Sequence, residues 1–371
     1  MSAIKRVEIS LANLPPLVQR TNAVRSMTSQ ETPIVRVFDD AGVEGIGYSW
    51  THGSGGSAIV ALLRDRLVPR LIGQEADRIE AVWADMFRAT QALSIGPVTS
   101  LAIAAIDIAL WDLKGKKTGQ SLWRMAGGAK DRLPAYTTDA GWLQFELPAV
   151  LGNVARDREA GFLASKLKVG KPTLGEDLAR LRAVRKAVGD DYELMVDANQ
   201  CFSFSEGVRR AHAFEECNLG WIEEPFPAED VEGHAKLRAG TSTPIANGES
   251  LYHPGQFRDY FQRGACSITQ PDIARIGGIT PWMKVAHMAE ANNIAVCPHY
   301  LMELSLSLAC GVPNGAWLEY IPQLELITDS RIELKDGSAV VWDRPGTGIE
   351  WNEQAIAKYA VMDSIVVDGK K

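Results

Sequence analysis

The sequence is poor in cysteine and lacks any cysteine pair of the kind that holds zinc or builds a disulfide framework. Among its 371 residues there are 5 cysteines and no CxxC motif. They are Cys201, Cys217, Cys266, Cys297 and Cys310. Scattered cysteines in odd number favour reduced thiols over a secreted disulfide scaffold. We therefore expect a cytoplasmic protein.

The chain also lacks a basic cluster and a long apolar run. Lysine and arginine total 39 against 46 acidic residues, a formal net charge of −7, which argues against nucleic acid or an anionic membrane as a partner. The first twenty residues carry Glu8 and two prolines where a signal peptide needs an apolar segment. The most apolar run, residues 101–111, contains Asp107 and is too short to span a bilayer.

The N-terminal third has a pattern of its own. Residues 1–50 alternate in the manner of strands, whereas residues 57–125 follow a helical period. Strands followed by helices predict a compact α+β domain, which we place at residues 1–128. Between the two zones lies a glycine-rich loop, residues 51–56, which is either a lid or an ordinary solvent loop.

After about residue 130 apolar strand-like runs alternate with amphipathic helical runs at steps of roughly 25 residues. This rhythm predicts parallel strands with crossover helices, and six or more units favour a closed (β/α) barrel over an open sheet. We place the barrel at residues 129–328. The turn-rich residues 329–371 are expected to return to the first domain. The strand candidates are residues 163–169, 192–197, 219–223, 244–246, 267–270, 294–297 and 316–319.

Two lysines occupy the first of these strand candidates. Lys166 and Lys168 are two residues apart, so on a strand their side chains point to the same face. Neighbouring ammonium groups and desolvation both lower a lysine pKa, toward the range in which the amine accepts a proton. Taken alone, such a pair is more often two surface lysines on an edge strand.

Three acidic residues follow three consecutive strand candidates. Asp197, Glu223 and Glu249 lie 26 residues apart, one β/α unit each. Active sites of such barrels lie at the C-terminal ends of the strands, so the three carboxylates should converge there. Crowded carboxylates repel one another unless a cation lies among them, and oxygen ligands suit Mg²⁺, with Mn²⁺ as an alternative. Any one of these acids by itself is more often a helix N-cap.

Polar residues also follow the remaining strand candidates. A carboxylate such as Asp272 beside the imidazole of His299 would fix the tautomer and raise the basicity of the ring. Alone, His299 is more often a structural histidine. Glu319 closes the ring; if protonated it would hydrogen-bond a developing oxyanion, and its alternative is a structural salt bridge.

This arrangement predicts one kind of reaction. The metal and Lys166 bind a substrate carboxylate, and Lys168 removes the proton α to it. The metal and nearby donors stabilise the resulting enediolate. His299, on the opposite face, then acts as general acid.

As a set, these motifs resemble the enolase superfamily, specifically its mandelate racemase branch, over nearly the whole chain. The matching segments are AIDIALWD at 105–112, KLKVG at 166–170, VDANQ at 196–200, WIEEP at 221–225, GE at 248–249, QPD at 270–272, PH at 298–299 and LE at 318–319. The resemblance implies an α/β protein in which an N-terminal α+β capping domain, completed by the C-terminal tail, covers a modified (β/α)7β barrel. Members usually self-associate, so a homo-oligomer is expected.

The resemblance also implies a role for each site residue. The Mg²⁺ ligands are Asp197, Glu223 and Glu249. The acid/base groups are Lys168, Asp272 and His299. The substrate contacts are Lys166, Asn199 and Glu319.

Within that branch the surrounding sequence is most similar to acid-sugar dehydratases of the galactarate/talarate type. Substrate choice in the family lies in capping loops, here residues 14–30 and 50–56. The first loop is more apolar than a six-carbon diacid needs, but Arg20, Arg25 and His52 offer polar contacts, and we expect His52 to bind substrate.

Two other functions stay open. In a racemase or epimerase of a 2-hydroxy acid, His299 would reprotonate the same carbon. In a dehydratase it would protonate a β-hydroxyl instead, releasing water and a 2-keto-3-deoxy acid. A non-catalytic binding protein on the same scaffold is the third possibility, against which the complete acid/base set argues.

Overall fold

The computed structural model describes residues 2–93 and 95–369, and in them the N-terminal domain is built on an antiparallel sheet. Its strand order is β16-β1-β4-β5. The turn between β4 and β5 is fixed by Asp39, whose Oδ1 accepts hydrogen bonds from the backbone N–H groups of Ala41 (3.0 Å) and Val43 (2.9 Å). The strands are β1 (Ile4–Leu14), β4 (Gln30–Asp39), β5 (Glu44–Tyr48) and β16 (Ile365–Asp368).

Helices cover this sheet, and the longest of them, α4 (Pro97–Thr118), packs directly on β5. A Cβ atom on Gly47 would lie 2.1 Å from the carbonyl oxygen of Ala105, so only glycine allows this approach. No helix in the described part of the chain is long and apolar enough to cross a membrane. The other helical segments here are α1 (Gly56–Leu62), a π-helix (Leu63–Leu67), α2 (Val68–Leu71), α3 (Ile79–Thr90) and α5 (Leu122–Met125).

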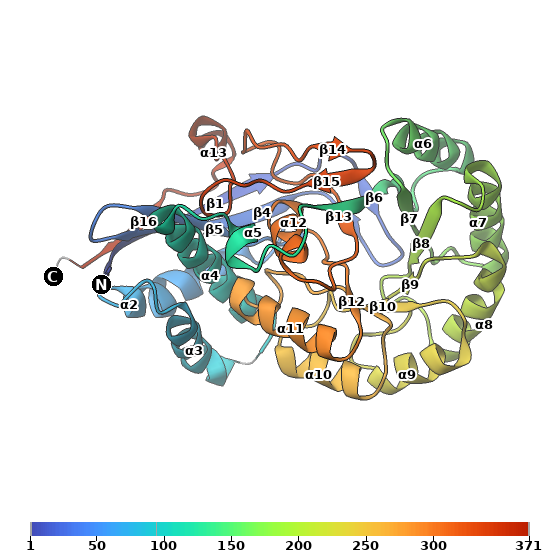
Figure 1. Cartoon of the computed structure of the whole chain (residues 1–371), viewed down its shortest axis with the longest axis horizontal. Coiled ribbons are helices and arrows are strands. Elements are labelled where there is room, and N and C mark those ends of the chain that lie inside the picture. The colour runs from blue at the N-terminus through green and yellow to red at the C-terminus, as the bar shows by residue number, and fades with distance from the viewer. Residues whose placement is uncertain (1, 94, 370–371) are drawn as a thin grey trace.

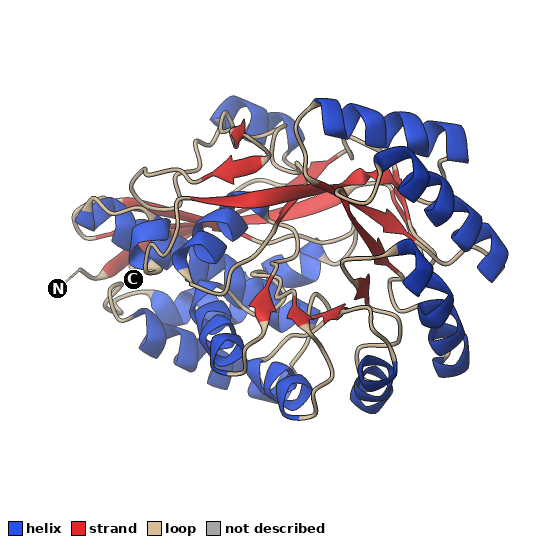
Figure 2. Cartoon of the chain, turned by 45° about the vertical axis from the view of Figure 1, so that its right-hand side comes forward, coloured by secondary structure: helices blue, strands red, loops and turns tan. Residues whose placement is uncertain are grey.

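The second domain is a closed barrel of parallel strands ringed by helices (Figures 1 and 2). Strands β6 to β12 pair in chain order, and β13 pairs with β6. The barrel closes between β12 and β13, where the Ala316 N–H donates to the Val296 carbonyl at 2.9 Å. The strands are β6 (Arg132–Gly141), β7 (Ala164–Lys168), β8 (Glu193–Asp197), β9 (Ile222–Glu223), β10 (Ile245–Asn247), β11 (Ile268–Thr269), β12 (Ala295–Val296) and β13 (Leu318–Tyr320).

One helix follows each strand of the barrel except β13, so the predicted (β/α)7β architecture is confirmed. The sequence pattern found the strands from β7 to β13 but not β6. Strand β6 contains Pro134 and a run of polar residues at 137–139, so it lacks the continuous apolar signal of a strand buried on both faces. The helices are α6 (Leu147–Glu159), α7 (Leu174–Val188), α8 (Phe204–Phe214), α9 (Val231–Gly240), α10 (Pro254–Gln262), α11 (Ile279–Ala291) and α12 (Met302–Gly311).

The C-terminal segment contacts both domains. The hairpin of β14 (Leu334–Lys335) and β15 (Ser338–Val340) adds to the N-terminal half of β6. Farther on, α13 (Glu353–Tyr359) packs on β1, and β16 pairs with β1 along residues 365–368. The domain boundaries at residues 128 and 328 stay predictions.

A buried carboxylate joins the two domains. Asp107 of α4 accepts hydrogen bonds from the backbone N–H (2.9 Å) and the hydroxyl (2.6 Å) of Thr280, in the first turn of α11. It therefore caps a barrel helix whose own N-cap, Gly278, has no side chain to do so.

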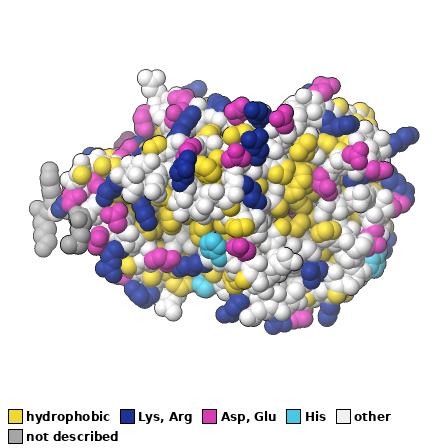
Figure 3. Space-filling model, in the orientation of Figure 1, with side chains coloured by type: hydrophobic (Ala, Val, Ile, Leu, Met, Phe, Trp, Pro, Cys, Tyr) yellow, Lys and Arg dark blue, Asp and Glu magenta, His cyan; other side chains and the backbone are white. Residues whose placement is uncertain are grey.

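On the face seen in Figure 3, acidic and basic side chains are interspersed.

Candidate active site

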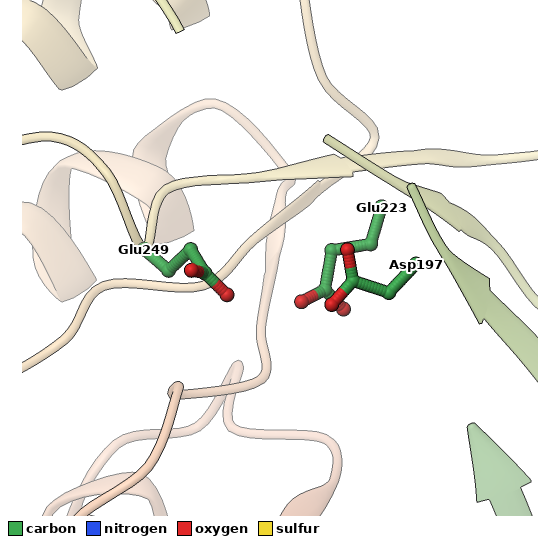
Figure 4. Close-up of side chains that lie close together, drawn as sticks. All are labelled: Asp197, Glu223 and Glu249. Atoms are coloured by element: carbon green, nitrogen blue, oxygen red, sulfur yellow. The ribbon is translucent and has the colours of Figure 1, made fainter. Parts of the chain in front are cut away.

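Three buried carboxylates converge at the C-terminal ends of neighbouring barrel strands. Asp197 ends β8, Glu223 ends β9, and Glu249 follows β10 by two residues. One oxygen of each lies within 4.8 Å of the others, and Figure 4 shows the three groups turned toward a common point. Gly248 permits the bend before Glu249, because its φ is 145° and a Cβ there would lie 2.8 Å from the Gln270 nitrogen.

The predicted lysine pair points at this cluster. Lys166 Nζ lies 2.9 Å from both oxygens of Glu223 and 3.0 Å from Glu319, and Lys168 Nζ contacts Asp197 Oδ2. Both lysines are buried, which excludes the reading of surface lysines on an edge strand.

The expected depression of the lysine pKa is wrong for Lys166. Burial lowers its pKa, but the carboxylates of Glu223 and Glu319 outweigh burial and hold the pKa well above its usual range. The sequence argument counted the neighbouring lysine and missed the closer carboxylates. Lys166 is therefore a fixed positive charge.

Burial, with Asp197 and Glu249 nearby, raises the pKa of Glu223 to about 7 despite Lys166.

Asp272 and His299 form the predicted pair on the other side of the cluster. His299 Nδ1 lies 2.8 Å from Asp272 Oδ2, and His299 Nε2 lies 3.2 Å from Glu249 Oε2. Burial lowers the His299 pKa, but Glu249 and Asp272 together raise it above its usual value. The Trp50 Nε1–H of the capping domain donates to Asp272 at 3.3 Å, so both domains shape this pair.

Glu319 is not the protonated acid that one reading of the sequence expected. It accepts hydrogen bonds from the Thr138 hydroxyl at 2.7 Å and the Tyr300 N–H at 3.0 Å, and it pairs with Lys166. Burial opposes its charge, but Lys166, His299 and Thr138 lower its pKa to about 2. Glu319 is thus an ionised carboxylate, and the alternative of a salt bridge is the correct one.

A cavity of about 440 Å³ opens over the cluster, within the range of small-molecule sites of roughly 300–1,000 Å³. Lys168, His299, Glu249, Glu319, Asn199 and His52 all line it. Lys166, Asp197, Glu223 and Asp272 are not among its lining residues and lie directly behind it. All the predicted site residues are therefore brought to one place.

Sequence reasoning missed three acidic or basic residues of this cavity, Arg275, Glu224 and Glu229. Arg275 donates to Glu249 Oε1 at 3.1 Å and lies over the Trp50 ring at 5.0 Å. Glu224 is buried, and burial together with Glu249 and Asp197 raises its pKa well above the usual value. Glu224 could have been found from the sequence, because it directly follows the strand-end residue Glu223. Arg275 could not, because nothing in the sequence distinguishes it from a surface arginine.

Fold and site together define a class of barrel enzymes. In this class acidic metal ligands lie at the ends of the barrel strands, a lysine and a histidine flank them, and a capping domain covers them. Residues 150–355 match the model of the enolase C-terminal domain-like family. Residues 7–127 match that of the mandelate racemase / muconate lactonizing enzyme N-terminal domain. The chain belongs to the enolase superfamily, in its mandelate racemase / muconate lactonizing enzyme branch.

Its similar proteins include several enzymes of acid sugars. L-talarate/galactarate dehydratase of Salmonella typhimurium is 36% identical, over 95% of this chain and 90% of the relative. 3,6-anhydro-alpha-L-galactonate cycloisomerase of Streptomyces coelicolor is 34% identical, over 96% and 99%. A crystal structure of a mutant L-talarate/galactarate dehydratase liganded with Mg and L-glucarate aligns with a TM-score of 0.95 at 34% identity, covering 100% of this chain and 94% of that one.

Proposed function

We propose that this protein is a Mg²⁺-dependent acid-sugar dehydratase of the galactarate/talarate kind. It removes the proton α to a carboxylate and then eliminates a β-hydroxyl as water, leaving a 2-keto-3-deoxy acid. The observation that carries the proposal is the position of the carboxylate cluster. It lies beneath one cavity, between Lys168, which contacts Asp197, and the Asp272–His299 pair, which contacts Glu249.

The donor set fits Mg²⁺. Asp197, Glu223 and Glu249 offer only carboxylate oxygens, which are hard ligands, and their number leaves positions for water and substrate. A bound divalent ion would supply Lewis-acid polarisation of the substrate carboxylate. Mn²⁺ suits the same oxygens and is the alternative ion.

The protein's own groups account for the proton transfers. Lys166, held as a cation between Glu223 and Glu319, binds and orients the substrate carboxylate. Lys168 removes the α proton, which gives the enediolate. The Nδ1–H of His299 donates to Asp272, so the Nε2 proton is the one that passes to the leaving hydroxyl.

The substrate contacts proposed for Asn199 and His52 rest on their place in the cavity wall. Asn199 takes a left-handed backbone conformation, with φ of 44°, directly after β8, and its N–H donates to Asp197 at 2.7 Å. It therefore lies beside the metal ligands, where a hydroxyl next to the reacting carbon would be held.

A racemase or epimerase of a 2-hydroxy acid is the second candidate. The same pair, Lys168 and His299, at two ends of the cluster would also permit removal and return of one proton on opposite faces of a carbon. A crystal structure described as a racemase from Streptomyces coelicolor, with bound magnesium, aligns with a TM-score of 0.93 at 33% identity. The two reactions differ in the substrate that they require, because elimination of water needs a β-hydroxyl and racemisation does not.

The deciding experiment is a screen of acid sugars and 2-hydroxy acids with Mg²⁺ in deuterated water. Keto-acid formation, detected with semicarbazide, supports the dehydratase. Deuterium at the α carbon without keto acid supports the racemase or epimerase. Absence of both, with substrates still bound, would leave only a binding protein and would refute the proposal.

Assembly and location belong to the same proposal. The protein acts in the cytoplasm as a homo-oligomer, with a small carboxylate substrate and no nucleic acid or membrane partner. Light scattering after size-exclusion chromatography tests the assembly, since a monomer at micromolar concentration would contradict it.

A further inference from the structure

The backbone directly after His299 is held in a strained conformation. Tyr300 and Leu301 have φ of 56° and 39°, in the left-handed region that residues other than glycine rarely adopt. Such residues persist only where their surroundings fix them, and they concentrate at functional sites. Here the Tyr300 N–H donates to Glu319 at 3.0 Å, and the Tyr300 carbonyl accepts a hydrogen bond from the Ser305 hydroxyl at 2.7 Å. The main chain at Tyr300 is therefore fixed on both sides.

This backbone turn brings two consecutive rings together. In an extended strand neighbouring side chains point to opposite faces, whereas the rings of His299 and Tyr300 stack, with centroids 5.3 Å apart and planes at 16°. The Trp50 ring packs on the same phenol ring, at a centroid distance of 4.2 Å. The torsion that turns an imidazole plane is a soft one, and the bond to Asp272 fixes only Nδ1. The stacked phenol ring therefore limits how far the imidazole plane can tilt.

The hydroxyl of Tyr300 is anchored in the capping domain. It donates to Oε1 of Gln30, the first residue of β4, at 2.7 Å. Gln30 Nε2 donates in turn to the Thr32 hydroxyl at 3.3 Å, and all three side chains are buried. A buried donor or acceptor that loses its partner keeps the full cost of desolvation, so this contact is costly to break. The far end of the phenol ring is thus fixed by a different domain from the one that carries His299.

Tyr300 is not itself a second acid. Burial, together with Asp272 and Glu319, raises its pKa far above the usual value, despite the nearby Arg20. The phenol is therefore neutral at physiological pH, and its proton is committed to Gln30. What the residue offers to the site is the position of its ring.

We propose that Tyr300 is the positioning residue of His299. Its ring holds the imidazole plane so that the Nε2 proton is aimed at the leaving hydroxyl, and its bond to Gln30 makes the capping domain part of this support. The inference rests on the proposed function and deepens it, because it assigns a residue to the elimination step alone. Lys168 is held separately, by its contact with Asp197 at the opposite end of the cluster. Loss of the ring should therefore slow elimination while removal of the α proton continues.

The test measures how the enediolate divides between two fates. The Lys168 ammonium exchanges its protons with solvent, so an enediolate that is reprotonated by Lys168 in deuterated water carries deuterium at the α carbon. An enediolate whose β-hydroxyl receives the His299 proton breaks its C–O bond, with the electron pair leaving on oxygen, and gives water and the keto acid. With galactarate and Mg²⁺, Tyr300→Leu should raise the ratio of α-deuterated substrate to keto acid at least about tenfold, as expected for a misplaced acid.

Two milder variants test the anchor in the capping domain. Tyr300→Phe keeps the ring and removes only its bond to Gln30, whereas Gln30→Met removes the acceptor. Each should raise the ratio about threefold, the size expected for one hydrogen bond. The double variant should raise it no further, because both changes delete the same interaction. Effects that multiply in the double variant would overturn the part assigned to the capping domain.

The matched control is Tyr359→Leu, which removes a half-buried tyrosine of α13 outside the cavity and should leave the ratio as in the wild type. A variant that is merely less folded loses both products in proportion, so its ratio does not change. Equal losses of deuterated substrate and keto acid in Tyr300→Leu would therefore overturn the inference. Formation of keto acid at the wild-type rate in this variant would overturn it too.

A spectroscopic measurement separates this inference from the proposed function. In protein labelled with ¹³C at histidine Cε1, the His299 resonance is the one that is absent in His299→Asn. In Tyr300→Leu this resonance should split or broaden, because the imidazole then takes more than one orientation, and in Tyr359→Leu it should stay as in the wild type. A single sharp resonance in Tyr300→Leu would overturn the inference.

The two proposals therefore fail in different ways. If the resonance splits in Tyr300→Leu but the wild type yields no keto acid from any acid, the proposed function fails and the positioning of His299 stands. If keto acid forms and Tyr300→Leu changes neither the resonance nor the ratio, the proposed function stands and the positioning role does not exist.

Discussion

His299 Nδ1 lies 2.8 Å from Asp272 Oδ2, and the other oxygen of Asp272 accepts hydrogen bonds from the N–H groups of Ala274 (2.8 Å) and Arg275 (2.9 Å). The carboxylate is therefore fixed by the backbone of its own loop, and it in turn fixes the imidazole. Asp272 thus orients the proposed general acid and, together with Glu249, favours its charged form.

Replacing this carboxylate by an amide should impair the acid step. In Asp272→Asn we expect kcat to fall about 100-fold, within the range for a mispositioned acid or base. Because Asp272 helps raise the His299 pKa, its loss should lower that pKa, so the alkaline limb of the kcat profile should move to lower pH. Steady-state kinetics from pH 5 to 10 measures both effects. The control is Asp259→Asn on α10, and a profile that does not move would contradict this role.

Lys168 is the proposed base, and its removal should separate chemistry from binding. In Lys168→Met we expect α-proton exchange into deuterated water to fall by at least about 1,000-fold, since a positioned base contributes about 10²–10⁴-fold. Mg²⁺ affinity, measured by calorimetry, should persist because no metal ligand is altered. Lys186→Met, an exposed lysine of α7, is the control. Exchange at the wild-type rate in Lys168→Met would rule out Lys168 as the base.

The carboxylate cluster should make thermal stability depend on the divalent ion. A ligand at 100 times its Kd stabilises the folded state by about 2.7 kcal/mol, which for a protein of this size should raise the Tm by about 3 °C or more. Differential scanning calorimetry with chelator and then with excess Mg²⁺ measures the change, with NaCl of equal ionic strength as the control. Asp197→Asn should lose most of the response, and an equal response in this variant would place the ion elsewhere.

Asp107 predicts a pH-dependent stability that originates at the domain junction. Burial raises its pKa to about 7, against the hydrogen bonds from Thr280, so the folded state holds a proton that the unfolded chain releases near pH 4. Stability should therefore fall as pH rises from about 4 to 7, by up to about 4 kcal/mol from this group alone.

In Asp107→Asn that contribution disappears. The Tm difference between variant and wild type should then move in favour of the variant from pH 5 to pH 8. Thermal unfolding at the two pH values measures it, and Asp190→Asn, an exposed acid just after α7, is the control. A Tm difference that is the same at both pH values would show that Asp107 is ionised throughout.

The periodic part of the fold and the ring of strand-end residues could be predicted from the sequence. Parallel strands buried on both faces carry an apolar signal, and the residue at the end of each strand is marked by its place in that pattern, as with Asp197 and Glu223. Strand β6 was not predicted because a proline and a run of polar residues interrupt its apolar pattern. The capping contact from Trp50 to Asp272 escaped because nothing in a sequence links positions so far apart.

By itself the sequence determined the architecture, the family and the strand-end residues that gather at the site, because periodicity and strand-end position are local properties of the chain. Only the tertiary structure decided the charge states. Lys166 keeps its proton because the carboxylates of Glu223 and Glu319 surround it. Glu319 is ionised in turn because Lys166 and His299 lie beside it. Electrostatic interaction depends on distance through space and on burial, and both are set by packing among residues remote in the chain.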